Sequence, residues 1–311
     1  MTLLQALLHI TDFRSPFLSN LAPAVTAAYA VQLAFGVPSV IRHSDLFYDL
    51  SGGFTFVLTL ASSFLLPALR TSSLTGADVS LGASWNWRQL AMTGGVLVYA
   101  ARLSSYLFSR ILTKGHDSRF DKTKHQPRRF FIFWMVQAVW VLLCSMPVIA
   151  IDAVPVSALN AIPNVTPTDI LGLGLFGLGF AVEVTADYQK SAWYGEKMNK
   201  VHDEQFITRG IWSRSRYPNY FGDITLWAGM ATAAAGVLLR EPVQAALGWS
   251  GVTGLVKGAL IPFLAPAFVS WALLRVSGVP LSEKKYDKLY GDRKDYQEWR
   301  SNTPLLVPRL F

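Results

Sequence analysis

The sequence predicts an all-α protein, a multi-pass transmembrane bundle of about seven helices. Three observations lead to this prediction. Of the 311 residues, 51% are hydrophobic and only 15% are charged, whereas roughly 25% of residues are charged in an average soluble protein. Mean hydropathy is positive, at +0.31. Seven stretches are apolar over the length of about 20 residues that a helix needs to cross a bilayer.

The seven predicted spans are separated by short polar segments. The first is the least apolar, and we expect Pro262 and Pro266 to interrupt the last, because proline removes a backbone donor. Residues 1–17 have no basic segment ahead of an apolar one, so no cleaved signal peptide is expected. In chain order, the spans are residues 20–38, 49–69, 89–112, 130–151, 168–188, 219–239 and 253–274.

The basic residues predict which side of the membrane each loop faces. Segments 113–129, 189–218 and 275–311 hold most of the 28 Lys and Arg residues, whereas loop 152–167 has none. With seven spans, these three segments lie on one side, which the positive-inside rule assigns to the cytosol. We therefore expect a cytosolic C-terminus. The net charge of +8 suits an anionic membrane surface better than nucleic acid, and no nucleic-acid partner is expected.

The chain shows no repeat, long linker or second domain. We expect a single integral membrane domain over residues 1–311, with residues 275–311 as a cytosolic C-terminal tail. Neither a Rossmann nor a P-loop glycine pattern is present. The five histidines are scattered and Cys144 is alone, so we expect no metal and no disulfide. The glycines of GLGLFGLGF at 172–180 lie within a span and favour close helix packing.

Ionisable residues gather where the fifth span ends. Charged groups inside a membrane are costly and usually face a bundle interior or a cavity. Glu183 and Asp187 are four residues apart and share a helix face. Asp187 and Lys190 are three apart, a spacing that also allows pairing.

The sixth span begins with a second polar group. Pro218 suits a first helical turn, so Asn219, Tyr220 and Asp223 lie near the helix start. Arg214 and Arg216 precede this start, where free backbone N–H groups attract anions. The residues alone therefore predict a site for a small phosphate-bearing molecule at the cytosolic face.

Four sequence blocks carry a family resemblance. GHDSRFDKTKHQPRRFFIFWMVQAVW, GFAVEVTADYQKSAW, RGIWSRSRYPNYFGDITLWAG and SGVPLSEKKYDKLYGDRKDYQEWRSNTPLLVP occur in this order. Together they resemble the steroid 5-alpha-reductase family, in its uncharacterised membrane branch with an R-H-P-N-Y-x-G-E type motif. The resemblance covers residues 45–311.

The resemblance implies a seven-helix fold in the endoplasmic reticulum membrane, with NADPH bound in a cavity that faces the cytosol. It also implies reduction of a carbon–carbon double bond in a lipophilic, sterol-like or enone substrate. Membrane lipid and this small molecule are the expected partners.

The resemblance also implies site residues. Asp187 and Asn219 match cofactor-contacting positions, and Tyr220 takes an aromatic position. Asp49 and Tyr99 fall near an acid and a tyrosine that contact the substrate carbonyl, and are the expected catalytic residues. The expected cofactor-binding residues are Arg119, Asp187, Lys190, Arg214, Arg216, Tyr217, Asn219, Tyr220, Asp223 and Tyr290.

Two positions depart from the family motif. Tyr217 stands where the branch usually has histidine, and Asp223 where it has glutamate. Both can still form hydrogen bonds. A role that needs a protonatable imidazole near neutral pH would be lost, because tyrosine titrates near pH 10. A contact that needs the reach of glutamate would have to pass through water.

Two alternatives remain open. Membrane S-adenosylmethionine-dependent methyltransferases of the isoprenylcysteine or phospholipid type share an R-[HY]-P-x-Y signature. The flanking DSRFD, ADYQK and SGVPLSEKKY blocks favour the reductase. The second alternative is a non-catalytic lipid binder on the same fold, which the Tyr217 and Asp223 departures allow.

Overall fold

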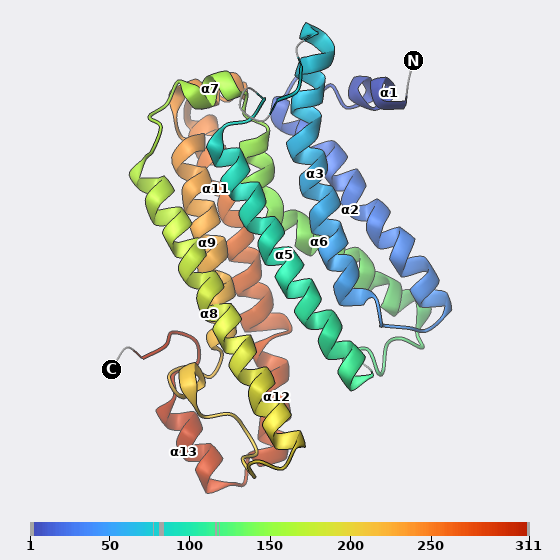
Figure 1. The fold of residues 1–311 in the computed structure, drawn as a ribbon, viewed down its shortest axis with the longest axis vertical. Helices are drawn as coiled ribbons and strands as arrows, with labels where there is room; N and C mark the ends of the chain where they lie inside the picture. The colour runs from blue at the N-terminus through green and yellow to red at the C-terminus, as the bar shows by residue number, and fades with distance from the viewer. Residues whose placement is uncertain (1–2, 77, 81–83, 116, 118, 310–311) are drawn as a thin grey trace. The chain divides into compact units, whose positions relative to one another are not determined.

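In the computed structural model, the described residues are 3–76, 78–80, 84–115, 117 and 119–309, and their regular elements are helical (Figure 1). This confirms the all-α prediction. In chain order, the elements are α1 (Leu3–Ile10), α2 (Pro16–Ile41), α3 (Tyr48–Thr75), α5 (Trp87–Lys114), α6 (Pro127–Asp152), α7 (Val156–Asn160), α8 (Pro167–Met198), η1 (Gly210–Ser213), α9 (Pro218–Leu238), α10 (Glu241–Ala246), α11 (Gly251–Trp271), η2 (Ala272–Val276), α12 (Val279–Tyr290) and α13 (Lys294–Asn302).

Among the described residues, six helical segments are long and apolar enough to cross a membrane, so the chain is an integral multi-pass membrane protein. They correspond to six of the seven predicted spans. The segments are Pro16–Ile41, Tyr48–Leu74, Pro127–Asp152, Pro167–Met198, Pro218–Leu238 and the run Gly251–Tyr290.

The other predicted span, residues 89–112, forms α5. This helix has 28 residues, which is long enough to cross a bilayer, but Arg88, Arg102 and Arg110 make it more polar than the six. Its start is set by a capping box, in which the Asn86 side chain accepts from the backbone of Arg88 and the Gln89 side chain accepts from the backbone of Asn86. Such caps satisfy the donors that a helix start leaves free.

The expected break at Pro262 and Pro266 is wrong, because α11 runs through both prolines without interruption. Each proline removes one backbone donor, and membrane helices tolerate this loss when local adjustments satisfy the freed carbonyl. The irregularity comes later, as a π-helical turn at η2. The segment expected as a C-terminal tail, residues 275–311, contains the last two residues of η2 together with α12 and α13.

Contacts group the residues into two compact units. Unit 1 comprises Met1–Thr166 and Ala234–Leu264, and unit 2 comprises Pro167–Ala233 and Ala265–Phe311. In unit 1, α2, α3 and α6 pack on one another, and α3 also packs on α5 (Figure 1).

In unit 2, glycines bring α8 and α9 into backbone contact. A Cβ atom at Gly179 would lie 2.5 Å from the carbonyl oxygen of Gly222, and one at Gly172 would lie 2.7 Å from that of Gly229. Both distances are shorter than any real Cβ contact, so only glycine fits. The predicted packing role of GLGLFGLGF is therefore confirmed for two of its glycines.

Replacing Gly179 by alanine should destabilise unit 2. The new methyl group would overlap the α9 backbone and push the helices apart, at a cost of about 1–3 kcal/mol. Gly174→Ala is the matched control, because a Cβ atom there meets nothing within 4 Å, and alanine gains about 1 kcal/mol over glycine in a helix. Thermal unfolding in detergent measures the difference, and equal melting temperatures would contradict the contact.

Candidate functional site

The polar site of unit 2 is assembled around the first turn of α9. The helix begins at Pro218, as predicted. The side-chain oxygen of Asn219 is buried, and no donor in the described part of the chain reaches it. One turn further on, the Asp223 carboxylate accepts a hydrogen bond of 3.0 Å from the Trp227 indole. Asn219 is thus a buried acceptor at a helix start.

Two carboxylates of α8 lie beside this turn. A Cβ atom at Gly222 would be 2.7 Å from the backbone nitrogen of Glu183, so the glycine contact sets Glu183 level with the start of α9. Asp187 follows one turn later on the same face. Glu183 and Asp187 are only 4% and 6% exposed. The close approach of the two backbones therefore brings these acids beside the helix turn that holds Asn219.

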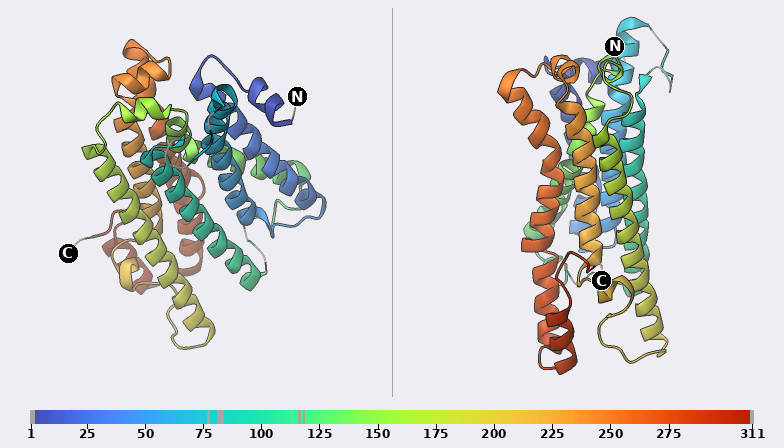
Figure 2. Two further views of the ribbon diagram at one scale, coloured as in Figure 1. Left: turned by 45° about the horizontal axis from the view of Figure 1, so that its top comes forward. Right: turned by 90° about the vertical axis from the view of Figure 1, so that its left-hand side faces the viewer.

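The segment after α8 folds back on that helix (Figure 2). The Trp212 indole donates to the Ala186 carbonyl at 3.0 Å. The Lys190 ammonium lies 4.7 Å from the centre of the Trp212 ring, a cation–π arrangement. Gly210 has φ of +62°, which glycine adopts without strain. These contacts bring the arginines that precede α9 back alongside α8.

Glu283 of α12 organises the approach to α9. One of its oxygens accepts from Arg216 at 2.6 Å and from Arg300 at 3.1 Å. The other accepts from the Tyr217 hydroxyl at 2.7 Å. The side chains of Arg216 and Glu283 are mostly buried. Arg216, predicted to bind phosphate, is therefore neutralised by a carboxylate, but its Nε atom is buried and reaches no acceptor among the described residues.

Tyr217 and Tyr220 form a stacked pair, with ring centres 5.2 Å apart and planes within 4°. A Cβ atom at Gly278 would lie 2.9 Å from the Tyr220 ring, so the start of α12 packs on this pair. Burial, followed by the hydrogen bond to Glu283, raises the pKa of the Tyr217 phenol far above its ordinary value. Tyr217 therefore remains a neutral hydrogen-bond donor.

The C-terminal segment lies along the predicted phosphate-binding arginines. The backbone nitrogen of Arg216 donates to the Pro304 carbonyl at 2.9 Å, and that of Arg309 donates to the Arg214 carbonyl at 3.0 Å. The Ser215 hydroxyl donates to the Leu306 carbonyl at 2.8 Å. Arg214 itself is exposed. These bonds attach the end of the chain to the residues that precede α9.

Tyr290, also predicted to bind the cofactor, belongs to an aromatic group between α12 and α13. Its ring lies 5.7 Å from Phe206 and 6.0 Å from Tyr286. Tyr296 and Trp299 pack on the same phenylalanine. The structure therefore gives Tyr290 a packing role, on a different part of α12 from Glu283.

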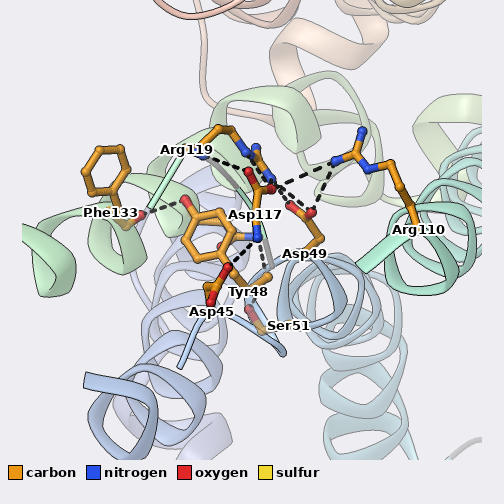
Figure 3. Close-up of polar contacts among 9 residues, drawn as sticks. Asp45, Tyr48, Asp49, Ser51, Arg110, Asp117, Arg119 and Phe133 are labelled. Atoms are coloured by element: carbon orange, nitrogen blue, oxygen red, sulfur yellow. Dashed lines mark hydrogen bonds and ion pairs between the residues drawn. The ribbon is translucent and has the colours of Figure 1, made fainter. Parts of the chain in front are cut away.

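The predicted catalytic acid Asp49 and the predicted cofactor arginine Arg119 are bonded to each other in unit 1 (Figure 3). Arg119 donates to both oxygens of Asp49 at 2.9 Å. It also donates to Asp117, whose backbone nitrogen donates to Asp45 at 2.7 Å. Arg110 lies 3.8 Å from Asp49. These ion pairs attach the loop after α5 to the start of α3.

The charges of this cluster stabilise one another. Burial alone would raise the pKa of Asp117, but hydrogen bonding and the charge of Arg119 outweigh it and lower that pKa. Burial opposes the charge of Arg119, whereas Asp49 and Asp117 raise its pKa further above its ordinary value. The Arg119 side chain is 46% exposed, so water screens part of this interaction.

The two predicted catalytic residues, Asp49 and Tyr99, do not come together in unit 1. Tyr99 is 2% exposed and packs edge-on against Phe56, at 6.2 Å between ring centres. Asp49 precedes Phe56 on α3 by seven residues, or about 10 Å along a helix axis. Asp49 is thus level with Arg110, near the other end of α5 from Trp87.

Sequence reasoning missed Glu283, Asp117 and Arg300. Glu283 is more than sixty residues from its partners Arg216 and Tyr217, and no helical spacing connects positions so far apart. Asp117 stands two residues before Arg119, and this Asp-x-Arg spacing within the DSRFD block could have indicated a local ion pair.

The fold and these buried polar clusters define a helical integral membrane protein with polar groups at the starts of its helices. A family described as "Protein of unknown function (DUF1295)" matches residues 37–303, and the chain belongs to this family. No curated protein matches the chain. No solved structure matches it either.

Replacing Glu283 by glutamine should loosen the C-terminal helices. The change leaves the mostly buried Arg216 without its counter-charge, which should cost about 2–4 kcal/mol. Glu298→Gln is the matched control, because Glu298 is exposed on α13. Limited trypsin digestion followed by mass analysis would detect earlier release of the C-terminal segment. Equal digestion of both variants would show that Glu283 does not hold the segment.

Alkaline pH should weaken the contact between α12 and α13. Burial, then the hydrogen bond to Asp287, raises the pKa of Tyr296 to about 12 from 10.0. Because the folded pKa is the higher one, this contribution to stability is complete below pH 10 and is lost as pH rises towards 12. Thermal unfolding, followed together with tyrosinate absorbance, should show this loss of stability in the wild type. The control variant Tyr188→Phe, which changes an exposed tyrosine, should show the same loss. Its persistence in Tyr296→Phe would refute the assignment.

Proposed function

We propose that the protein is a membrane oxidoreductase that uses NADPH to reduce a carbon–carbon double bond in a lipophilic, sterol-like or enone substrate. The observation that carries the proposal is a pair of buried atoms at the start of α9. The Asn219 oxygen reaches no donor, and the Arg216 Nε atom reaches no acceptor, within the described residues. The two atoms belong to residues three positions apart in the chain. A ligand that has both a hydrogen-bond donor and an acceptor would satisfy them.

The residues around this pair fit a reduced pyridine nucleotide. Ribose hydroxyls and a carboxamide NH₂ group are donors, which Asn219 and the carboxylates of Glu183 and Asp187 would accept. Phosphate oxygens are acceptors, which suit guanidinium and ammonium groups such as Arg214, Arg216 Nε and Lys190. The stacked Tyr217 and Tyr220 rings add a flat apolar surface beside them.

The bound nucleotide would supply the hydride, and the chain would bind it, orient it and limit access of water. Glu283, which also accepts from the Tyr217 hydroxyl, keeps the guanidinium of Arg216 in place. The catalytic roles of Asp49 and Tyr99 stay predictions. The resemblance to the steroid 5-alpha-reductase family supports the reaction class and the endoplasmic reticulum membrane, and the basic segments support a cytosolic C-terminus.

One observation also favours the methyltransferase alternative. The carboxylates of Glu183, Asp187 and Asp223 accompany Asn219, while Glu283 neutralises Arg216. An acidic surrounding of this kind would also suit S-adenosylmethionine, which carries a positive sulfonium and a ribose but no phosphate. The two cofactors differ in the sign of their charge, so binding measurements can separate them.

Purified protein should bind NADPH, and Asn219→Ala should weaken binding by about tenfold or more, as expected for loss of one buried hydrogen bond. Asn199→Ala, an exposed asparagine just after α8, is the matched control and should bind normally. Nucleotide fluorescence and thermal shift give the affinities, with S-adenosylmethionine as competitor. Binding of S-adenosylmethionine instead of NADPH would replace the proposal with the methyltransferase, and binding of neither would leave a lipid binder.

A further inference from the structure

Helix α3 of unit 1 has its polar residues inside and its apolar residues outside. Ser51, Thr55, Thr59 and Ser63 are four residues apart and 0% exposed. Spacing of four places them on one helix face. On other faces of the same helix, Phe54, Leu58 and Leu65 are among the exposed hydrophobic residues. The four hydroxyls therefore form a stripe within the helix bundle.

Polar side chains of α2 and α6 face this stripe. Gln32 of α2 donates to Thr55 at 2.7 Å and to Ser51 at 3.3 Å. A Cβ atom at Gly52 would lie 2.4 Å from the Gln137 amide of α6. At the other end of the stripe, Ser63 donates to Asp152 of α6 at 2.8 Å.

These pairs define a parallel register between α3 and α6. Gly52 lies opposite Gln137, and Ser63 lies opposite Asp152, and both Thr59 and Ser145 lie between these two contacts along their helices. We call the whole set the polar column. Its members are Gln32, Ser51, Thr55, Thr59, Ser63, Gln137, Ser145 and Asp152.

Four atoms of the polar column are buried without a hydrogen-bond partner in the described residues: Thr59 Oγ1, Ser145 Oγ, Gln32 Oε1 and Gln137 Oε1. Hydroxyls in helices usually donate to the carbonyl four residues earlier, as Thr55 does to Ser51, but Thr59 does not. Buried polar groups left open in this way are normally satisfied by internal water. Hydroxyls that only held helices together would have hydrogen-bond partners, and those of Thr59 and Ser145 have none among the described residues.

The spacing of the hydroxyls fits single water molecules. Four residues of helix rise about 6 Å, which is too far for a direct hydrogen bond. Two hydrogen bonds in series through one water span about 5.6 Å. One water between successive hydroxyls would therefore complete a continuous chain along α3.

One end of the polar column lies at a cavity. A cavity of about 510 Å³ in unit 1 is lined by Asp152, Gln89, Ser19 and Arg70, among others. Asp152 also receives the Thr93 hydroxyl at 3.3 Å. At the opposite end, Ser51 donates to the carbonyl of Tyr48, the first residue of α3. The column thus runs from a carboxyl group at a cavity to the far end of the helix.

We propose that the polar column, completed by single water molecules, conducts protons through unit 1 between the Asp152 cavity and the Tyr48 end of α3. Each transfer forms one O–H bond on the accepting oxygen and breaks one on the donating oxygen, so no oxidant or reductant takes part. Asp152 exchanges protons with water in the cavity. Protons suit the column better than hydrated ions, because the side chains of Gln137 and Ser104 pack directly against α3 at Gly52 and Gly53.

Proton flux into vesicles tests this inference directly. Purified protein in liposomes that contain a pH-sensitive dye should conduct protons under an imposed potassium diffusion potential, with NADPH absent. Asp152→Asn should reduce flux to the level of protein-free vesicles. Thr59→Val keeps the side-chain shape, removes the hydroxyl and should reduce flux several-fold. Thr26→Val, an exposed hydroxyl on α2, is the matched control and should conduct like wild type.

The thermal unfolding of the same variants separates a hydrated column from a dry one. If water bonds Thr59, Thr59→Val should melt below wild type and conduct poorly. If the site is dry, removal of an unsatisfied hydroxyl should leave the melting temperature equal or higher. Three results would overturn the inference. They are a melting temperature of Thr59→Val equal to or above that of wild type, full flux in Thr59→Val, and wild-type flux equal to that of empty vesicles. None of these measurements depends on nucleotide binding, so the proposed reductase stands or falls separately.

Discussion

The organisation of unit 2 depends on the backbone contact between α8 and α9. In a membrane, helices gain little from hydrophobic association, and close packing through small residues replaces it. Gly179 and Gly222 allow this contact, and Gly222 belongs to the same motif as Asn219. The contact places Glu183 and Asp187 beside the first turn of α9. A motif that looks like a binding signature is therefore also a packing device, and the geometry of its polar residues follows from the glycine.

The second constraint in unit 2 is the need to neutralise buried positive charge. Arg216 is mostly buried two residues before the membrane-span helix α9, and an unpaired buried cation is costly. Glu283 compensates that charge and takes the Tyr217 hydroxyl with its other oxygen. A tyrosine at position 217 suits this arrangement, because a neutral phenol can donate to Glu283 at any physiological pH. The same ion pair in turn fixes α12 against the residues that precede α9.

The spacing of residues close together in the chain predicted the features that depend on helix geometry alone. The start of α9 at Pro218, the packing role of Gly172 and Gly179 and the shared face of Glu183 and Asp187 follow from helix geometry and were visible in the sequence. The partners Glu283 and Asp152 were not, because each meets residues more than sixty positions away in the chain. The break expected at Pro262 and Pro266 failed because a helix can lose single hydrogen bonds without ending. Asp49 and Tyr99 were expected to act together, but the register of α3 and α5 separates them along the helix axis.

In unit 1, the buried hydroxyl groups of α3 carry an energetic cost of their own. Serine and threonine are tolerated in membrane helices when they bond to their own backbone or to a neighbouring helix. Thr55 and Ser63 satisfy this rule, whereas the hydroxyls of Thr59 and Ser145 are buried and reach no hydrogen-bond partner within the described part of the chain. Alanine or valine at those two positions would pack without leaving polar atoms unsatisfied. An interior that keeps open hydroxyls between a carboxyl group and a glutamine pair, while leucine and phenylalanine face outward, is better explained by internal water than by packing alone.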